Sequence, residues 1–322
     1  MRLVLILTAL LALQGCAESK LDEMKALADQ GDADAQYNLG VRYDNGFGVP
    51  ENDAEAVKWY RKAADQGYAD AQYALAFMYA KGEGVPENDA EAVKWWLKAA
   101  DQGDADAQYN LGIMYDNGRG VPENDAEAVK WWLKTADQGD AKSQYNLGIM
   151  YGNGRGVPEN DAEAVKWYRK AADQGDADAQ YNLGIMYGNG RGVPENDAEA
   201  VKWYRKAADQ GHAKAQFIIG RVYDFGKGIP ENDAEAVKWY RKAAAQGHAE
   251  AQNYLGFNYR TGEGVPENNI RAYVWWSMAK TQGHAKAATD IDKLKPKMTP
   301  QQIADGQALA TKCYESNYTD CD

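Results

Sequence analysis

GVPENDAEAVKW, at residues 48–59, recurs along this chain of 322 residues. The same twelve letters begin again, at a step of 36 residues each time, at Gly84, Gly120, Gly156 and Gly192. Two altered copies continue the series from Gly228 and Gly264. A fixed period of this length is typical of repeat proteins, in which each unit packs only against its neighbours. We therefore predict seven units, at residues 32–67, 68–103, 104–139, 140–175, 176–211, 212–247 and 248–283.

The first half of each unit has the pattern of an amphipathic helix. In the first unit Ala35, Leu39 and Tyr43 recur at i, i+4 and i+8, which places them on one helix face. Gly40 would let a second helix approach closely, although glycine costs about 1 kcal/mol of helix propensity relative to alanine. Gly46 then ends this helix, because glycine readily takes the left-handed conformation that closes a helix.

The second half of each unit predicts another helix, which starts with a capping box. Asn52 can accept hydrogen bonds from the first-turn amides, while Glu55 reaches back to the Asn52 backbone. Apolar residues follow at helical spacing from Ala56 to Ala64, and Gly67 ends the helix. Two helices of about 12–14 residues cannot bury their apolar faces alone, so the units must stack. The expected fold is all-α: an alpha-alpha superhelical solenoid of seven 36-residue helix-turn-helix repeats with capping helices.

Both ends of the repeat array differ from its middle. Residues 26–31 are in register with the end of a second helix, so residues 16–31 predict an N-terminal linker and half-repeat cap. Residues 284–322 predict capping helices and a tail that contains two cysteines. There Thr299 and Gln302 form a second capping box, with Pro300 at the first helical position.

The first fifteen residues have the features of a secretory signal peptide. Arg2 supplies a positive charge, and residues 3–13 are an apolar run too short to cross a bilayer. The run leads to Cys16 in a sequence that resembles the bacterial lipoprotein box, in which the cysteine receives lipid. We expect export to the periplasm and anchoring to the outer membrane through lipidated Cys16. The alternative is cleavage after Ala17, which would give a soluble periplasmic or secreted protein.

The repeat itself resembles a known family. AQYNLGIMYDNGRGVPENDAEAVKWWLKTADQG, residues 107–139, looks like the Sel-1-like repeat, a relative of the tetratricopeptide repeat. The resemblance implies a superhelix that contacts other proteins, and many bacterial members are secreted or envelope adaptors. We therefore expect a non-enzymatic scaffold that binds a protein or peptide partner in a concave groove. The partner's identity and the oligomeric state stay open.

The tetratricopeptide layout implies that two positions of the first helix point into this groove. The first ladder is Tyr37, Tyr73, Tyr109, Tyr145, Tyr181, Phe217 and Asn253. The second ladder is Val41, Phe77, Ile113, Ile149, Ile185, Arg221 and Phe257. Aromatic residues at helical spacing are more often core than binding surface, and that alternative stays open for the first ladder.

The sequence offers little catalytic chemistry. The three histidines, His212, His248 and His284, stand 36 residues apart and are expected at the surface without converging on a site. No metal-ligand spacing and no cofactor motif is present, and a net charge of −12 disfavours nucleic acid as a partner. The rival hypothesis is an envelope hydrolase or a protein that binds cell-wall fragments, with beta-lactamase-like activity from groove carboxylates.

Two cysteines remain if Cys16 carries lipid. In an oxidising compartment Cys313 and Cys321 are expected to form a disulfide that ties the tail to the last helix. A redox or metal role for this pair is the alternative.

Overall fold

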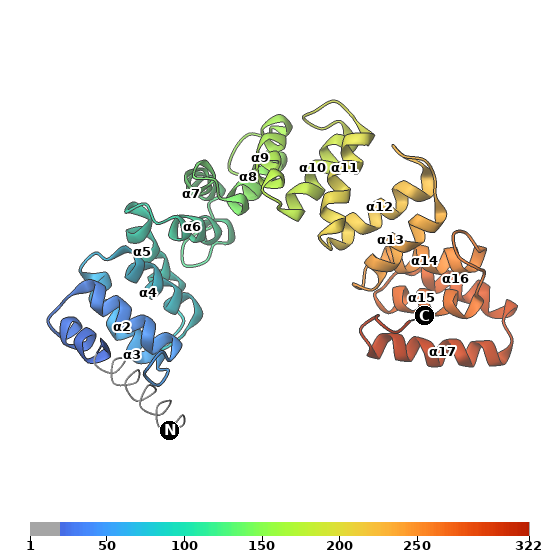
Figure 1. The fold of residues 1–322 in the computed structure, drawn as a ribbon. Helices are drawn as coiled ribbons and strands as arrows, with labels where there is room; N and C mark the ends of the chain where they lie inside the picture. The colour runs from blue at the N-terminus through green and yellow to red at the C-terminus, as the bar shows by residue number, and fades with distance from the viewer. Residues whose placement is uncertain (1–19, 322) are drawn as a thin grey trace, which may run out of the picture. The chain divides into compact units, whose positions relative to one another are not determined.

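The computed structural model describes residues 20–321, and over this range it contains helices and no strand (Figure 1). Cys16 and the signal segment lie outside the described residues. The chain divides into two compact units, one up to Glu159 and the other from Asn160 onward. This division inside the array was not predicted, and it follows from the repeat design, because each repeat contacts only its neighbours.

The first unit begins with a helix over residues 20–29. In each repeat we call the first helix A and the second helix B. The A helices of this unit are α2 (Ala33–Asn45), α4 (Ala69–Lys81), α6 (Ala105–Asn117) and α8 (Ala141–Asn153). Its B helices are α3 (Asp53–Asp65), α5 (Asp89–Asp101) and α7 (Asp125–Asp137). Within the unit α2 packs on α3, and α3 packs on α4, so that consecutive helices are antiparallel neighbours.

The second unit has the same alternation of A and B helices, followed by additional C-terminal helices. Its B helices are α9 (Asp161–Asp173), α11 (Asp197–Asp209), α13 (Asp233–Ala244) and α15 (Asn269–Thr281). Its A helices are α10 (Ala177–Asn189), α12 (Ala213–Phe225) and α14 (Ala249–Thr261). The chain ends with α16 (Ala285–Leu294), the 3-10 turn η1 (Lys295–Lys297) and α17 (Pro300–Glu315). The repeat helices have 12 or 13 residues, as the spacing predicted.

The capping box predicted at the start of helix B is only half present. The Asn52 side chain accepts from the backbone N–H of Glu55 at 3.1 Å, as expected. The Glu55 carboxylate does not return to Asn52 but pairs with Lys58. The reason is that the Asn52 N–H already donates to the Tyr43 carbonyl at 2.8 Å. At Thr299 this N–H is available to the Gln302 side chain, and both halves of the box form.

A glycine of helix A sets its distance from helix B. A Cβ added at Gly112 would lie 2.2 Å from Trp132 Nε1, which is closer than a side-chain carbon can approach another atom. This closeness lets the indole N–H donate to the Tyr109 carbonyl at 3.3 Å. The second repeat has Ala76 instead, and the equivalent indole nitrogen of Trp96 is buried without a hydrogen-bond partner. The indole is thus hydrogen-bonded where a glycine lies opposite it, at Gly112 and Gly256, and is without this bond opposite Ala76.

Buried glutamines join successive repeats, which the sequence analysis did not anticipate. Gln72 is 4% exposed, and its side-chain amide donates to the Ala64 carbonyl at 3.1 Å. Its oxygen accepts from Gln102 Nε2 at 2.8 Å, so that one side chain links two B helices through the A helix between them. The same pair recurs in both units, for example between Gln246 and Gln216. The sequence contains the signal for this link, since a glutamine is copied after the buried small residue of every helix A, which is serine in α8 and alanine in the other six.

The C-terminal segment covers the last repeat. α17 packs on α15, where Gly306 admits the Tyr273 ring. Cys313 and Cys321 are joined by a disulfide, with their Cα atoms 4.5 Å apart. Both cysteines are buried, so the bond fixes the tail against the capping helix.

We predict that Gly112→Ala destabilises the protein by about 1–3 kcal/mol, because the methyl group overpacks the contact with Trp132 and breaks its hydrogen bond. Chemical denaturation followed by circular dichroism measures the loss. Ala76→Gly is the matched control, since it restores the repeat's usual residue at the equivalent position. An unfolding free energy for Gly112→Ala equal to that of the wild type would contradict the role assigned to this contact.

Candidate partner-binding face

The first ladder is half-buried and packs against other rings. In the first unit the Tyr37 ring centre lies 5.8 Å from that of Tyr60 on helix B and 5.3 Å from that of Tyr68, the first residue of the next repeat. In the second unit Tyr181 has the same neighbours, with Tyr204 at 5.9 Å and His212 at 4.8 Å. These rings therefore hold repeats together while showing one edge to solvent.

The histidines are caps of A helices and not freely exposed side chains, which corrects the expectation. His212 and His248 each have 15% of the side chain exposed. The Nδ1 atom of His248 accepts from the Ala251 N–H at 3.3 Å, and its ring stacks on Phe217 at 4.8 Å. They do not converge, because each serves its own repeat.

The second ladder is the more exposed of the two. Phe77 in the first unit is 39% exposed, and Phe257 in the second is 45% exposed. Arg221 is exposed, and its guanidinium lies 5.6 Å from the ring centre of Phe225. The remaining members, Val41, Ile113, Ile149 and Ile185, are partly exposed. The A helices of each unit thus present apolar side chains to solvent.

The seventh repeat departs from the predicted ladder. Asn253 is only 5% exposed, because the order of asparagine and tyrosine is reversed there and Tyr254 takes the place of the ring. The Tyr254 ring lies 5.5 Å from Phe217 and 5.3 Å from Tyr240.

Beside Tyr254 is a hollow of about 490 Å³ in the second unit. Phe225 and Phe257 line it together with Asp224 and Glu231. Phe225 is 60% exposed and had not been singled out from the sequence. The sequence does contain a sign of this exposure, because Phe225 replaces the asparagine or lysine that ends helix A in the preceding repeats.

Comparison with protein families gives the same periodicity. Seven consecutive segments match the model of the Sel1 repeat, at residues 33–68, 69–104, 105–140, 141–176, 177–212, 213–248 and 249–284. The chain belongs to the Sel1 repeat family. Each segment begins one residue after the boundary predicted from the sequence.

Two solved structures support the Sel1 assignment. A Sel1 repeat protein from Oxalobacter formigenes is 35% identical, with a TM-score of 0.74 over 87% of this chain and 81% of that chain. The protective antigen c5321 of uropathogenic Escherichia coli, which has an SLR fold, is 29% identical, with a TM-score of 0.55 over 92% and 88%. Comparison with curated proteins finds no significant match. Sel1 repeat proteins typically mediate protein–protein interaction, and their fold is generally a non-enzymatic scaffold.

Carboxylates near the A helices have structural partners in this Sel1 array. Burial raises the pKa of Asp104, which caps α6 by accepting from the Ala107 N–H at 2.6 Å. Burial also raises the pKa of Asp224, which accepts from the Tyr240 hydroxyl at 3.0 Å. Among the described residues no group of three or more His, Cys, Asp or Glu side chains is arranged to hold a metal ion.

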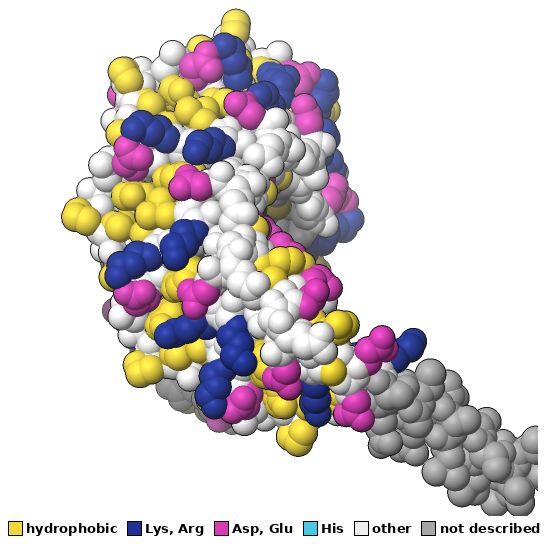
Figure 2. Space-filling view, turned by 90° about the vertical axis from the view of Figure 1, so that its left-hand side faces the viewer, with side chains coloured by type: hydrophobic (Ala, Val, Ile, Leu, Met, Phe, Trp, Pro, Cys, Tyr) yellow, Lys and Arg dark blue, Asp and Glu magenta, His cyan; other side chains and the backbone are white. Residues whose placement is uncertain are grey.

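Basic side chains are interleaved with other types. Figure 2 shows Lys and Arg side chains scattered among hydrophobic and acidic ones over one face of the molecule. On the B helices lysine lies over tryptophan in repeat after repeat, as Lys62 does at 3.7 Å from the Trp59 ring. On the B helices these lysines therefore make local cation–π contacts with tryptophan. Within residues 20–321 no helix is long and apolar enough to span a membrane.

We predict that stability depends on pH through His248. Burial, with Lys214 nearby, lowers the pKa of His248 against the opposing effect of Glu250. Its neutral form is the one that can accept the Ala251 N–H, so the folded state binds the proton less readily than the unfolded state. The free energy of unfolding should fall as pH drops from about 7.5 to about 5, through the ordinary histidine range. His248→Asp, which places there the residue found at Asp104, should show a smaller fall; parallel pH profiles would contradict the assignment.

Proposed function

We propose that this Sel1 repeat protein is an exported scaffold of the bacterial cell envelope, held at the outer membrane by lipid on Cys16. It binds a protein or peptide partner through the exposed side chains of the A helices in each unit. The family supplies the general role, since Sel1 repeat proteins typically contact other proteins. The signal-like first fifteen residues and Cys16 support the location.

The observation that carries the proposed binding face is the exposure of large apolar side chains. Six large hydrophobic side chains are exposed within the described residues, and three of them, Phe77, Phe225 and Phe257, lie on A helices. Exposed aromatic side chains with partly buried aliphatic neighbours are typical of binding hot spots. The half-buried first ladder beneath them keeps the surface rigid, which lowers the entropic cost of binding.

The face should be tested by site-specific crosslinking in envelope extract. We expect photo-crosslinkers at Phe77 and Phe257 to capture a defined partner. Crosslinkers at Lys58 and Lys238, which are exposed on B helices, serve as controls and should not capture it. With the identified partner, Phe77→Ala or Phe257→Ala should weaken binding by about tenfold, or about 1.4 kcal/mol. Equal capture from A and B positions would contradict the proposed face.

The anchor should be tested separately by metabolic labelling with a fatty acid. We expect the wild-type protein to carry label and to enter the detergent phase, because lipid on Cys16 provides the membrane affinity. Cys16→Ser should lose the label and leave the membrane fraction. A mature N-terminus immediately after Ala17, read by mass spectrometry, would instead establish the soluble alternative.

A further inference from the structure

The helix over residues 20–29 is a helix B without a helix A before it in the described chain. The 36-residue period aligns Met24 with Tyr60 and Leu27 with Ala63. In a complete repeat helix A lies on this side of helix B: a Cβ added at Gly40 of α2 would lie 2.5 Å from the Tyr60 ring. At the N-terminal end the corresponding surface is uncovered in the described chain.

Exposure shows how incomplete this end is. The residue equivalent to Leu27 is buried in all seven repeats, with exposures of 0% at Ala63, Ala99, Ala171, Ala207, Ala243 and Ala279 and 1% at Thr135. Leu27 itself is 44% exposed, and it is a larger residue than the alanine of the repeats. An apolar side chain left in water at this position is unfavourable unless something covers it.

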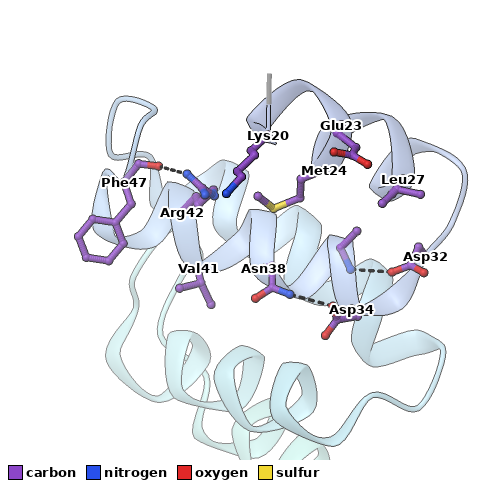
Figure 3. A pocket seen from close by; sticks show the side chains of 11 residues that line it. Lys20, Glu23, Met24, Leu27, Asp32, Asp34, Asn38, Val41, Arg42 and Phe47 are labelled. Atoms are coloured by element: carbon purple, nitrogen blue, oxygen red, sulfur yellow. Dashed lines mark hydrogen bonds between the residues drawn. The ribbon is translucent and has the colours of Figure 1, made fainter. Parts of the chain in front are cut away.

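The uncovered surface forms a hollow of about 670 Å³ (Figure 3). We call it the N-terminal seat, formed by Lys20, Met24 and Leu27 of the first helix and by Val41 and Arg42 of α2. Figure 3 shows the side chains of both helices around the open space, with Met24 between them.

The charges of the N-terminal seat are polarised along α2. Lys20 and Arg42 lie at one end, and Asp32 and Asp34 lie at the other, with Glu23 on the first helix between Lys20 and Leu27 (Figure 3). The A helices of this unit run parallel, since Tyr68 at the start of α4 donates its hydroxyl hydrogen to Asp34 in the first turn of α2, at 3.0 Å. A helix seated as helix A is in the repeats would therefore have its N-terminus near the acidic end and its C-terminus near the basic end. This arrangement is complementary to the helix macrodipole.

We propose that the N-terminal seat binds an amphipathic helix of a partner protein, parallel to α2, in the way that helix A packs on helix B in every repeat. The occupant carries a small residue against Met24 and an aromatic ring near Met24 and Asp32, as Gly40 lies against Tyr60 and as Tyr37 lies beside Tyr60 and Tyr68 one repeat later. This mode is helix-in-groove recognition. After the proposed processing at Cys16 only residues 16–19 precede Lys20, fewer than the 13 residues of a helix A. This last step rests on the proposed function, whereas the seat itself does not.

The probe is a helix-stabilised peptide with the sequence of residues 104–117, which is a helix A of this chain with its capping residue. Binding to the purified, exported full-length protein is measured by fluorescence anisotropy. We expect saturable binding that Leu27→Glu weakens by about tenfold, because a carboxylate then enters the apolar part of the seat. Tyr314→Glu, a change at an exposed aromatic residue of α17 in the other unit, should leave the affinity unchanged.

Two further variants separate helix docking from non-specific adhesion. Lys20→Glu should weaken binding because it places an anion beside the negative C-terminal end of the peptide helix. Lys58→Glu is the matched control on an exposed lysine, and it should have no effect. A chain in which residues 104–124 are joined directly to Ala17 keeps the 36-residue register and fills the seat internally. This chain should lose peptide binding and unfold at a higher temperature.

Three results would overturn the proposal. They are absence of peptide binding to the wild-type protein, equal affinity of Leu27→Glu and the wild type, and undiminished binding to the chain whose seat is filled internally. A concentration-dependent dimer in light scattering that Leu27→Glu dissociates would also overturn it, by showing that a second copy occupies the seat. The A-face crosslinks and the Cys16 label report on the proposed function independently, so either proposal can fail without the other.

Discussion

The close contact between a glycine of helix A and an aromatic ring of helix B is the constraint on which the geometry of five repeats depends. Gly112 and Trp132 show it directly, since the ring occupies the space that a Cβ would need. The same contact recurs at Gly40, Gly184, Gly220 and Gly256. It fixes the separation of the two helices, and that separation determines where the next helix can pack. A 36-residue period can therefore produce one geometry throughout each unit.

The contact between helices within a repeat does not by itself join one repeat to the next. The buried glutamines do so, because each bonds a backbone carbonyl of the preceding helix B and a glutamine of the following one, as Gln72 does with Ala64 and Gln102. A buried amide with both ends satisfied specifies register as well as adding stability. The first-ladder rings also join successive repeats, since Tyr37 packs against rings of its own repeat and of the next. A residue of a type that is common in partner-binding surfaces can thus instead join two repeats of the array.

The period, the helix limits and the buried alanine and leucine positions could be predicted because they follow from local patterns. What could not be predicted depended on contacts across repeats. The Glu55 side chain was free to leave its capping role only because Tyr43 had already taken the Asn52 N–H. The exposure of Phe225 and the burial of Asn253 likewise depend on neighbours that the sequence of one repeat does not display. Because most polar residues are repeated in all seven units, the sequence does not show which of them make contacts between repeats.

The residues before and after the seven repeats differ from the repeat pattern, and so do a few positions within it. After the last repeat α17 packs on α15, and the Cys313–Cys321 disulfide ties the following residues to α17. Among the described residues the first helix is a helix B with no helix A before it, and Leu27 is exposed where the equivalent residue is buried in every repeat. Each repeat of a solenoid is stabilised by the neighbour that covers it, so an apolar surface left uncovered at this point is suited to bind another helix. The repeats thus form a common scaffold. Surfaces that can differ from one such protein to another arise where residues depart from the repeat pattern, as at Leu27, Phe225 and Tyr254.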